Sequence, residues 1–74
     1  METQFLVIEI QKNDQGVVSN IVTAYTDKRQ AESAYYTILA AAALSNLPVH
    51  TAMVIDDMGN TYHKESYLKE ITPV

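Results

Sequence analysis

The chain has only two glycines, Gly16 and Gly59, and each lies in a cluster of turn-forming residues. The first cluster is Asn13–Gly16 and the second is Asp56–Asn60. Asn and Asp tolerate turn conformations and Gly readily adopts a positive φ, so each cluster is typical of a tight hairpin turn. The 74 residues are therefore divided into two hairpin-like halves, which limits the folds that this chain can adopt.

The segments that flank both turns are rich in β-branched and large apolar residues, as strands are. The expected strands are Phe5–Ile10, Val17–Tyr25, Val49–Ile55 and Thr61–Leu68. Alternation gives the first strand two faces: Leu6, Ile8 and Ile10 on one, and Phe5, Val7 and Glu9 on the other. The fourth strand is the least hydrophobic, which favours a position at a sheet edge.

The segment between the two hairpins carries the signals of a helix. Asp27 is suited to cap its N-terminus, and Gln30 three residues later completes a capping-box pattern. The run Ala40–Ala43 has the highest helix propensity available. Small and apolar residues recur every three or four positions and form one stripe: Ala31, Ala34, Tyr35, Ile38, Ala41, Ala42 and Ser45. Asn46 is the expected C-cap, and Pro48 prevents further helix.

The predicted fold is a single α+β domain over residues 1–74, with ββαββ order and one helix packed on one face of a four-stranded antiparallel sheet. The strand order 2-1-3-4 makes every neighbouring pair antiparallel and keeps the most apolar strand central. The helix covers one face only, so the other face carries either Phe5 and Val7 or their alternates. Several large apolar residues on an uncovered face form a patch that is typical of an interface.

The charge and composition exclude several classes of function. The net charge is −4 and the five basic residues are scattered, whereas a nucleic-acid binder needs a clustered basic surface. There is no cysteine, which excludes disulfides and thiolate metal sites. The N-terminus lacks the features of a signal peptide, and no apolar run is long enough to span a bilayer. We therefore expect a cytoplasmic protein without a nucleic-acid or membrane partner.

The two histidines are the natural place to look for a metal or acid–base site. His63 and Glu65 share a strand face, and His50 is the candidate for a third ligand. If Met58 and Gly59 form the loop, however, His63 pairs with Val54 and His50 pairs with Tyr67. The two histidines are then offset by four residues along the strands. At ~3.3 Å per residue, the two histidines are too far apart to bind one ion within a monomer. We predict no metal and no cofactor.

Other catalytic patterns are missing from the sequence. Asp56 and Asp57 lie at a turn and lack the further oxygen ligands of a calcium loop, so we interpret them as turn formers. Two isolated glycines do not make a phosphate-binding loop, and no serine has a histidine neighbour in a nucleophile motif. We therefore predict no catalytic residues and a protein that is not an enzyme.

Five tyrosines supply most of the aromatic side chains. Tyrosine combines a large apolar ring with a polar tip and is enriched at protein interfaces. Tyr35 belongs to the apolar helix stripe, whereas Tyr36 lies about 100° further around the helix and is expected at its flank or outer side. The predicted interface residues are Phe5, Val7, Ile21, Tyr25, Tyr36 and Tyr67.

Several segments together resemble small uncharacterised proteins encoded in phage and prophage regions of gut Gram-positive bacteria. These segments are the helix Gln30–Tyr36 running into Ala40–Ala43, then Leu47–Thr51, Ile55–Asn60 and the Tyr-bearing last strand. The resemblance covers most of the chain. It implies a phage-derived gene, and it assigns no catalytic residues.

The leading hypothesis is a non-enzymatic interaction or assembly module that self-associates as a homo-oligomer through a sheet face or a strand edge. A second hypothesis is a small acidic inhibitor or regulator of a basic host protein. A third is a small enzyme whose site is assembled between subunits from His63, Glu65 and Tyr67.

Overall fold

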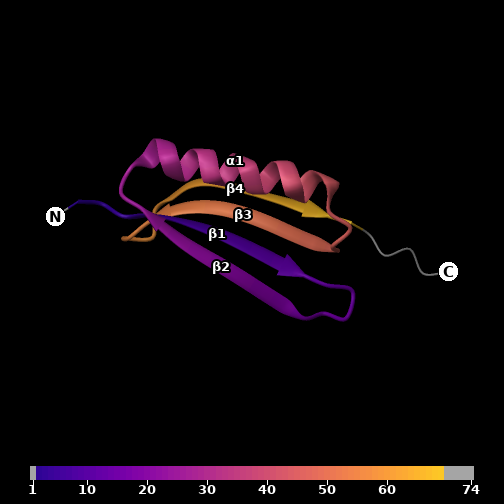
Figure 1. Cartoon of the computed structure of the whole chain (residues 1–74). Coiled ribbons are helices and arrows are strands. Elements are labelled where there is room, and N and C mark those ends of the chain that lie inside the picture. Colours follow the sequence, from indigo (N-terminus) through magenta and orange to yellow (C-terminus); the bar gives the residue numbers. More distant parts are fainter. Residues whose placement is uncertain (1, 70–74) are drawn as a thin grey trace.

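The computed structural model describes residues 2–69, which form four strands and one helix. The elements are β1 (Phe5–Lys12), β2 (Val18–Tyr25), α1 (Lys28–Leu44), β3 (Val49–Asp56) and β4 (Thr61–Leu68). The strands form one antiparallel sheet in the order β2-β1-β3-β4, and α1 lies along one face of it (Figure 1). The predicted ββαββ fold and strand order are confirmed. β1 extends two residues beyond the predicted strand because Gln11 and Lys12 pair with β2 and β3 on both sides.

The first hairpin turn is fixed by one asparagine side chain. Asn13 Oδ1 accepts hydrogen bonds from the backbone N–H groups of Gln15 and Val17, both at 2.9 Å. Gly16 has a φ of 82°, in the left-handed region that favours glycine. These bonds hold the end of β1 against the start of β2, so the turn sets the register of the whole hairpin.

The second hairpin turn is organised by Asp56. Its Oδ1 accepts from the backbone N–H groups of Met58 and Asn60, and its Oδ2 accepts from Asn60 Nδ2 and from the Tyr62 hydroxyl. The hydrogen bond from the Asn60 side chain is the largest cause of a lowered pKa, which places the Asp56 carboxyl at about 2. The interpretation of Asp56 as a turn former is confirmed.

The register of the second hairpin is as predicted over most of its length. His63 lies opposite Val54 and His50 lies opposite Tyr67. A register shift follows between Val54 and Ile55. The shift lies beside Tyr62, whose hydroxyl reaches Asp56 and whose ring packs edge to face on Phe5 at a centroid distance of 5.7 Å.

The helix begins as predicted and ends one residue earlier. Asp27 is the N-cap, and its Oδ1 accepts from the Arg29 N–H at 2.8 Å. The C-cap is Ser45, so the prediction of Asn46 was wrong. Ser45 has an extended backbone, its N–H donates to the Ala42 carbonyl, and its Oγ accepts from the Leu47 N–H at 3.1 Å. The serine hydroxyl thus provides a hydrogen-bond acceptor for a backbone N–H group just after the helix ends.

The core lies between α1 and the two central strands and is built from small residues. Its buried members are Val7, Ala31, Tyr35, Ala52 and Val54. Alanines on both layers let the helix approach the sheet closely. Among residues 2–69, Val54 is the largest residue whose side chain is fully buried. So thin a core makes a domain of this size only marginally stable by itself.

We predict that Asp56 makes the stability of the fold sensitive to acid. The pKa of Asp56 is about 2, below the value of about 3.9 for an aspartate in an unfolded chain. The free energy of unfolding should therefore fall as the pH is lowered from about 4 towards 2. Urea denaturation followed by circular dichroism across this range measures the loss.

The variant Asp56→Asn should be less stable at pH 7 and should lose less stability between pH 4 and pH 2. Asp57→Asn is the matched control, because Asp57 in the same turn accepts only the Gln4 N–H at 3.2 Å among the described hydrogen bonds. An Asp56→Asn protein with the same acid dependence as the wild type contradicts this role.

Candidate protein interface

The register of the sheet assigns each strand residue to one of two faces, because directly paired residues share a face. One face carries Val7, Ala52 and Val54, which pack against Ala31 and Tyr35 of α1. We call this side the covered face. Its two central rows are Thr23–Val7–Val54–His63 and Ile21–Glu9–Ala52–Glu65.

The opposite side, which we call the open face, carries most of the large aliphatic residues of the strands. It comprises Leu6, Ile8, Ile10, Val18, Val22, Val49, Met53, Ile55 and Leu68. No element among residues 2–69 packs on it. Val22 is 54% exposed and Leu68 is 72% exposed, whereas the residues of β1 and β3 are half-buried by their neighbours in the sheet. The open face is therefore a continuous apolar surface over the centre of the sheet.

The structure corrects the face on which two predicted interface residues lie. Val7 is 2% exposed and belongs to the core, and Phe5 is half-buried and packs against that core. The alanine-rich helix packs closely on the smaller residues of this face, such as Ala52. The alternate residues Leu6, Ile8 and Ile10 are left on the open face.

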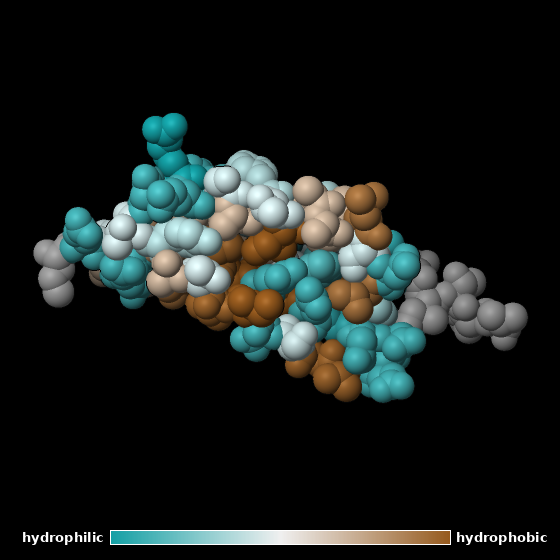
Figure 2. All heavy atoms as spheres, viewed as in Figure 1, coloured by the Kyte–Doolittle hydropathy of each residue, from teal (hydrophilic) through white to brown (hydrophobic). Residues whose placement is uncertain are grey.

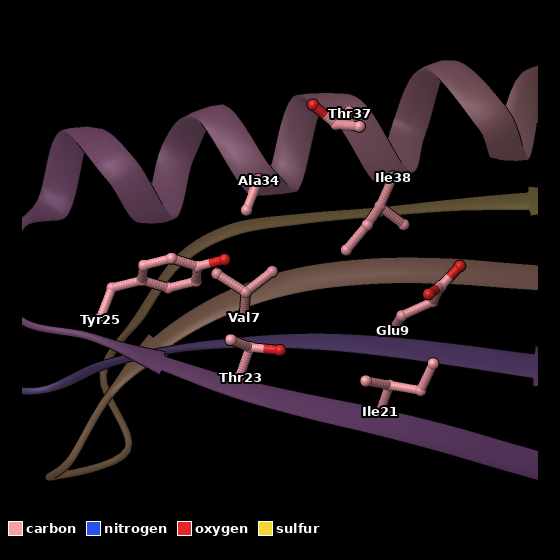
Figure 3. Close-up of a pocket in the computed structure, with 8 residues that line it drawn as sticks. All are labelled: Val7, Glu9, Ile21, Thr23, Tyr25, Ala34, Thr37 and Ile38. Carbon is pink, nitrogen blue, oxygen red and sulfur yellow. The ribbon is translucent and has the colours of Figure 1, made fainter.

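Ile21 and Tyr25 lie beside a hollow between α1 and β2. The hollow has a volume of about 290 Å³, and Figure 3 shows the side chains that line it: Val7, Glu9, Ile21, Thr23, Tyr25, Ala34, Thr37 and Ile38. Hydrophobic atoms gather in the same region between the helix and the lower strands in Figure 2. Ile21 is 60% exposed, so this wall of the hollow is accessible.

Tyr36 and Tyr67 lie apart from this hollow, on α1 and β4. Tyr36 is exposed, as predicted, and its ring packs edge to face on Tyr35 at 5.1 Å. Tyr67 pairs with His50 on the covered face and is partly exposed. The six predicted interface residues therefore do not form one surface. Their role in an interface stays a prediction, and Val7 has no exposed surface to offer.

His63 is held within its own chain by α1. Its Nε2 lies 2.7 Å from Glu32 Oε2, and its ring stacks on Tyr35 at a centroid distance of 5.0 Å. Burial is the main cause of a raised pKa of the Tyr35 hydroxyl, and the nearby Glu65 carboxylate adds to it. The Tyr35 hydroxyl therefore stays protonated at neutral pH, and its ring is part of the core under α1.

His50 and Glu9 form a second pair, which the sequence analysis missed. His50 Nε2 lies 2.6 Å from Glu9 Oε2, and Gln11 Nε2 donates to the same oxygen at 3.0 Å. His50 is 4% exposed, and its Nδ1 is buried without a hydrogen-bond partner among the described residues. The buried Nδ1 is closed to solvent, and the pair joins β1 to β3, while the Glu9 side chain also lines the hollow beside Ile21.

Two further types of site are missing from the described residues. In residues 2–69 no group of three or more histidine, aspartate or glutamate side chains is placed to hold a metal ion. The two histidines pair with different glutamates and lie at different rows of the sheet. Within the same residues, no helix has the length and apolar character needed to cross a membrane.

Comparison with known proteins gives no match: no protein-family model, no curated protein and no solved structure matches the chain. The resemblance to phage and prophage proteins therefore stays a prediction. The case for a function depends on the geometry of the open face and of the sheet edges.

We predict that the Glu9–His50 pair stabilises the fold more than the Glu32–His63 pair. The Glu9 and His50 side chains are 17% and 5% exposed, so Glu9→Ala leaves a buried imidazole without its partner. Such a loss costs about 1–3 kcal/mol. Urea denaturation at neutral pH measures the change in the free energy of unfolding.

Glu32→Ala is the matched control, because the Glu32 and His63 side chains are 30% and 26% exposed. Its expected cost is under about 1 kcal/mol, as for other solvent-accessible pairs. Equal costs for the two variants contradict a structural role that is specific to Glu9 and His50.

Proposed function

We propose that the protein is a non-enzymatic assembly module that binds a second copy of itself through the open face. One observation carries this proposal: the large aliphatic residues of the two central strands point away from the only helix among the described residues. A sheet with one layer of helix usually turns its larger apolar residues inward. The reverse arrangement indicates that a second layer comes from outside the chain.

The hydrophobic effect favours covering this face. Full burial of one Leu, Ile or Met side chain stabilises a structure by about 1.5–3 kcal/mol, and the half-buried residues of the open face gain a fraction of that each. The core under α1 contains few large side chains. Association through the open face therefore adds a second apolar layer to a domain whose own core is thin.

A second copy fits the open face by its residue pattern. If a two-fold axis runs along the strands between β1 and β3, each β1 lies over the β3 of the partner. Leu6 then faces the partner's Ile55, and Ile8 faces the partner's Met53. Two sheets packed in this way lie about 10 Å apart with their strands nearly aligned. Apolar side chains thus meet apolar side chains across the centre of the contact.

The charges on the open face are compatible with this pairing. Its strand residues include Lys12 and Lys64 and no acidic residue. The same two-fold axis places Lys64 opposite the partner's Val22 and Lys12 opposite the partner's Val49, so the lysines do not meet. Their aliphatic stems cover apolar surface while their ammonium groups reach water at the rim.

The size of the face favours a contact at the small end of specific interfaces. Four strands of eight residues span roughly 500 Å² of sheet per copy, from their rise and spacing. Two copies thus contribute about 1,000 Å², near the lower limit for a specific contact. We therefore expect an association that depends on concentration and dissociates on dilution.

The other two hypotheses receive less support. The open face carries lysines and no carboxylates, so it does not present an acidic surface to a basic host protein. His63 is paired with Glu32 of its own chain, which leaves it poorly placed for an intersubunit catalytic site. Both remain predictions.

We predict that Ile8→Lys lowers the degree of self-association. Ile8 lies in the centre of the open face, and a lysine there would have to be desolvated in the proposed contact. Sedimentation equilibrium at high micromolar concentration should give a larger average mass for the wild type than for Ile8→Lys. Val22→Lys on the same face should act in the same direction, and its exposed position makes it tolerant in the folded chain.

Val17→Lys is the matched control, because Val17 is 59% exposed in the turn before β2. The average mass of the Val17→Lys protein should match that of the wild type. Circular dichroism should show that all variants are folded. A wild type that stays strictly monomeric at these concentrations contradicts the proposal. So does a monomeric wild type that binds anionic lipid vesicles, because the open face would then be a membrane-binding surface.

A further inference from the structure

The outer edge of β2 presents backbone groups that are free to pair. β2 is an end strand of the sheet and bonds to β1 on one side only. Its exposed edge carries a row of N–H and C=O groups that can template another strand. All but one of its eight residues are exposed, so no other described part of the chain shields the strand.

The sequence of β2 lacks the features that protect a sheet edge. Natural edge strands commonly use charged residues, proline or bulges to prevent pairing with another chain. β2 runs from Val18 to Tyr25 without a charged residue, a glycine or a proline, and it pairs with β1 in unbroken register. The other edge strand, β4, carries His63, Lys64 and Glu65 and has a register shift. The two edges of the sheet therefore differ, and β2 is the edge that lacks these protective features.

The hollow between α1 and β2 lies along this edge. Ile21, Thr23 and Tyr25 form its wall on β2, and residues of α1 form the opposite wall, as Figure 3 shows. A strand added beside β2 would place every second side chain on the same side as α1. Strand addition of this kind takes its affinity from main-chain hydrogen bonds and its specificity from such hollows.

We propose that β2 pairs antiparallel with the β2 strand of a second copy. Two antiparallel copies of one strand are related by a two-fold axis perpendicular to the sheet, because opposing residues must share a face. Both α1 helices then lie on the same side. In a register centred on Ile21 or Val22, Ile21 contacts the partner's Ile21 or Thr23 at the mouth of the two hollows. No register brings like charges together, because β2 has none.

This edge contact is separate from the open-face contact of the proposed function and uses a different axis. A face-to-face dimer leaves both of its β2 edges free. Edge pairing between such dimers therefore builds assemblies larger than a dimer. A chain with a disrupted open face retains edge-paired dimers only.

Thr23→Lys tests the edge contact, because Thr23 is exposed on β2 and faces the hollow. Sedimentation velocity at high micromolar concentration should give assemblies larger than a dimer for the wild type. Thr23→Lys and Ile8→Lys should each reduce the assembly to dimers, and the double variant should be monomeric. Ser19→Lys, on the same face of β2, serves as a second edge variant if Thr23→Lys does not fold.

Glu65→Lys is the matched control, since Glu65 is exposed on β4 at the opposite edge and pairs with Ala52 on the covered face, away from the open-face contact. It should sediment as the wild type does. Hydrogen exchange in the Ile8→Lys background should show that amides of β2 gain protection with concentration and that those of β4 do not.

The outcomes separate this inference from the proposed function. If Ile8→Lys lowers the mass and Thr23→Lys leaves it unchanged, edge pairing is wrong and the open-face contact stands. If Thr23→Lys lowers the mass and Ile8→Lys does not, the reverse holds. An Ile8→Lys protein whose β2 amides exchange equally fast at all concentrations also overturns edge pairing.

Discussion

One helix can cover one face of a four-stranded sheet, and the rest of this structure follows from which face it covers. α1 brings alanines and Tyr35 to a face whose central residues are Val7, Ala52 and Val54. The same face holds the hydrogen-bonded Glu9 and His50 side chains, which are largely buried there and add no apolar surface to the core. The larger aliphatic side chains of β1 and β3 are consequently left on the open face. Both faces of the sheet are therefore apolar at the centre, and the helix among residues 2–69 covers one of them.

The two hairpin turns decide which residues enter each layer. A slip of one residue in a strand exchanges its two faces, so the register must be held firmly. Asn13 and Asp56 each bind several groups of their own turns, and both glycines adopt positive φ values there. The Glu9–His50 pair ties β1 to β3 across 41 residues of sequence. Local turns and one long-range pair thus position the open face and the free β2 edge together.

The strands, the helix, the strand order and the pairing of His63 with Val54 could be predicted from the sequence. These features depend on local turns and on the alternation of apolar residues. The covered face was not predictable in this way. β1 carries apolar residues on both faces, with Phe5 and Val7 on one and Leu6 and Ile8 on the other, so hydrophobicity alone does not choose between them. The Glu9–His50 pair and the hollow beside Ile21 were missed because they join segments that are distant in the sequence.

The most direct test of this account is the solvent exposure of individual methyl groups on the open face. Methyl-resolved NMR with a soluble paramagnetic agent, recorded from low to high micromolar protein, compares Ile8 and Ile55 with Ile38, which packs on the core. The account predicts that the Ile8 and Ile55 methyls are relaxed by the agent in dilute protein and become protected as the concentration rises. Methyls at these two positions that stay equally exposed at every concentration would contradict it.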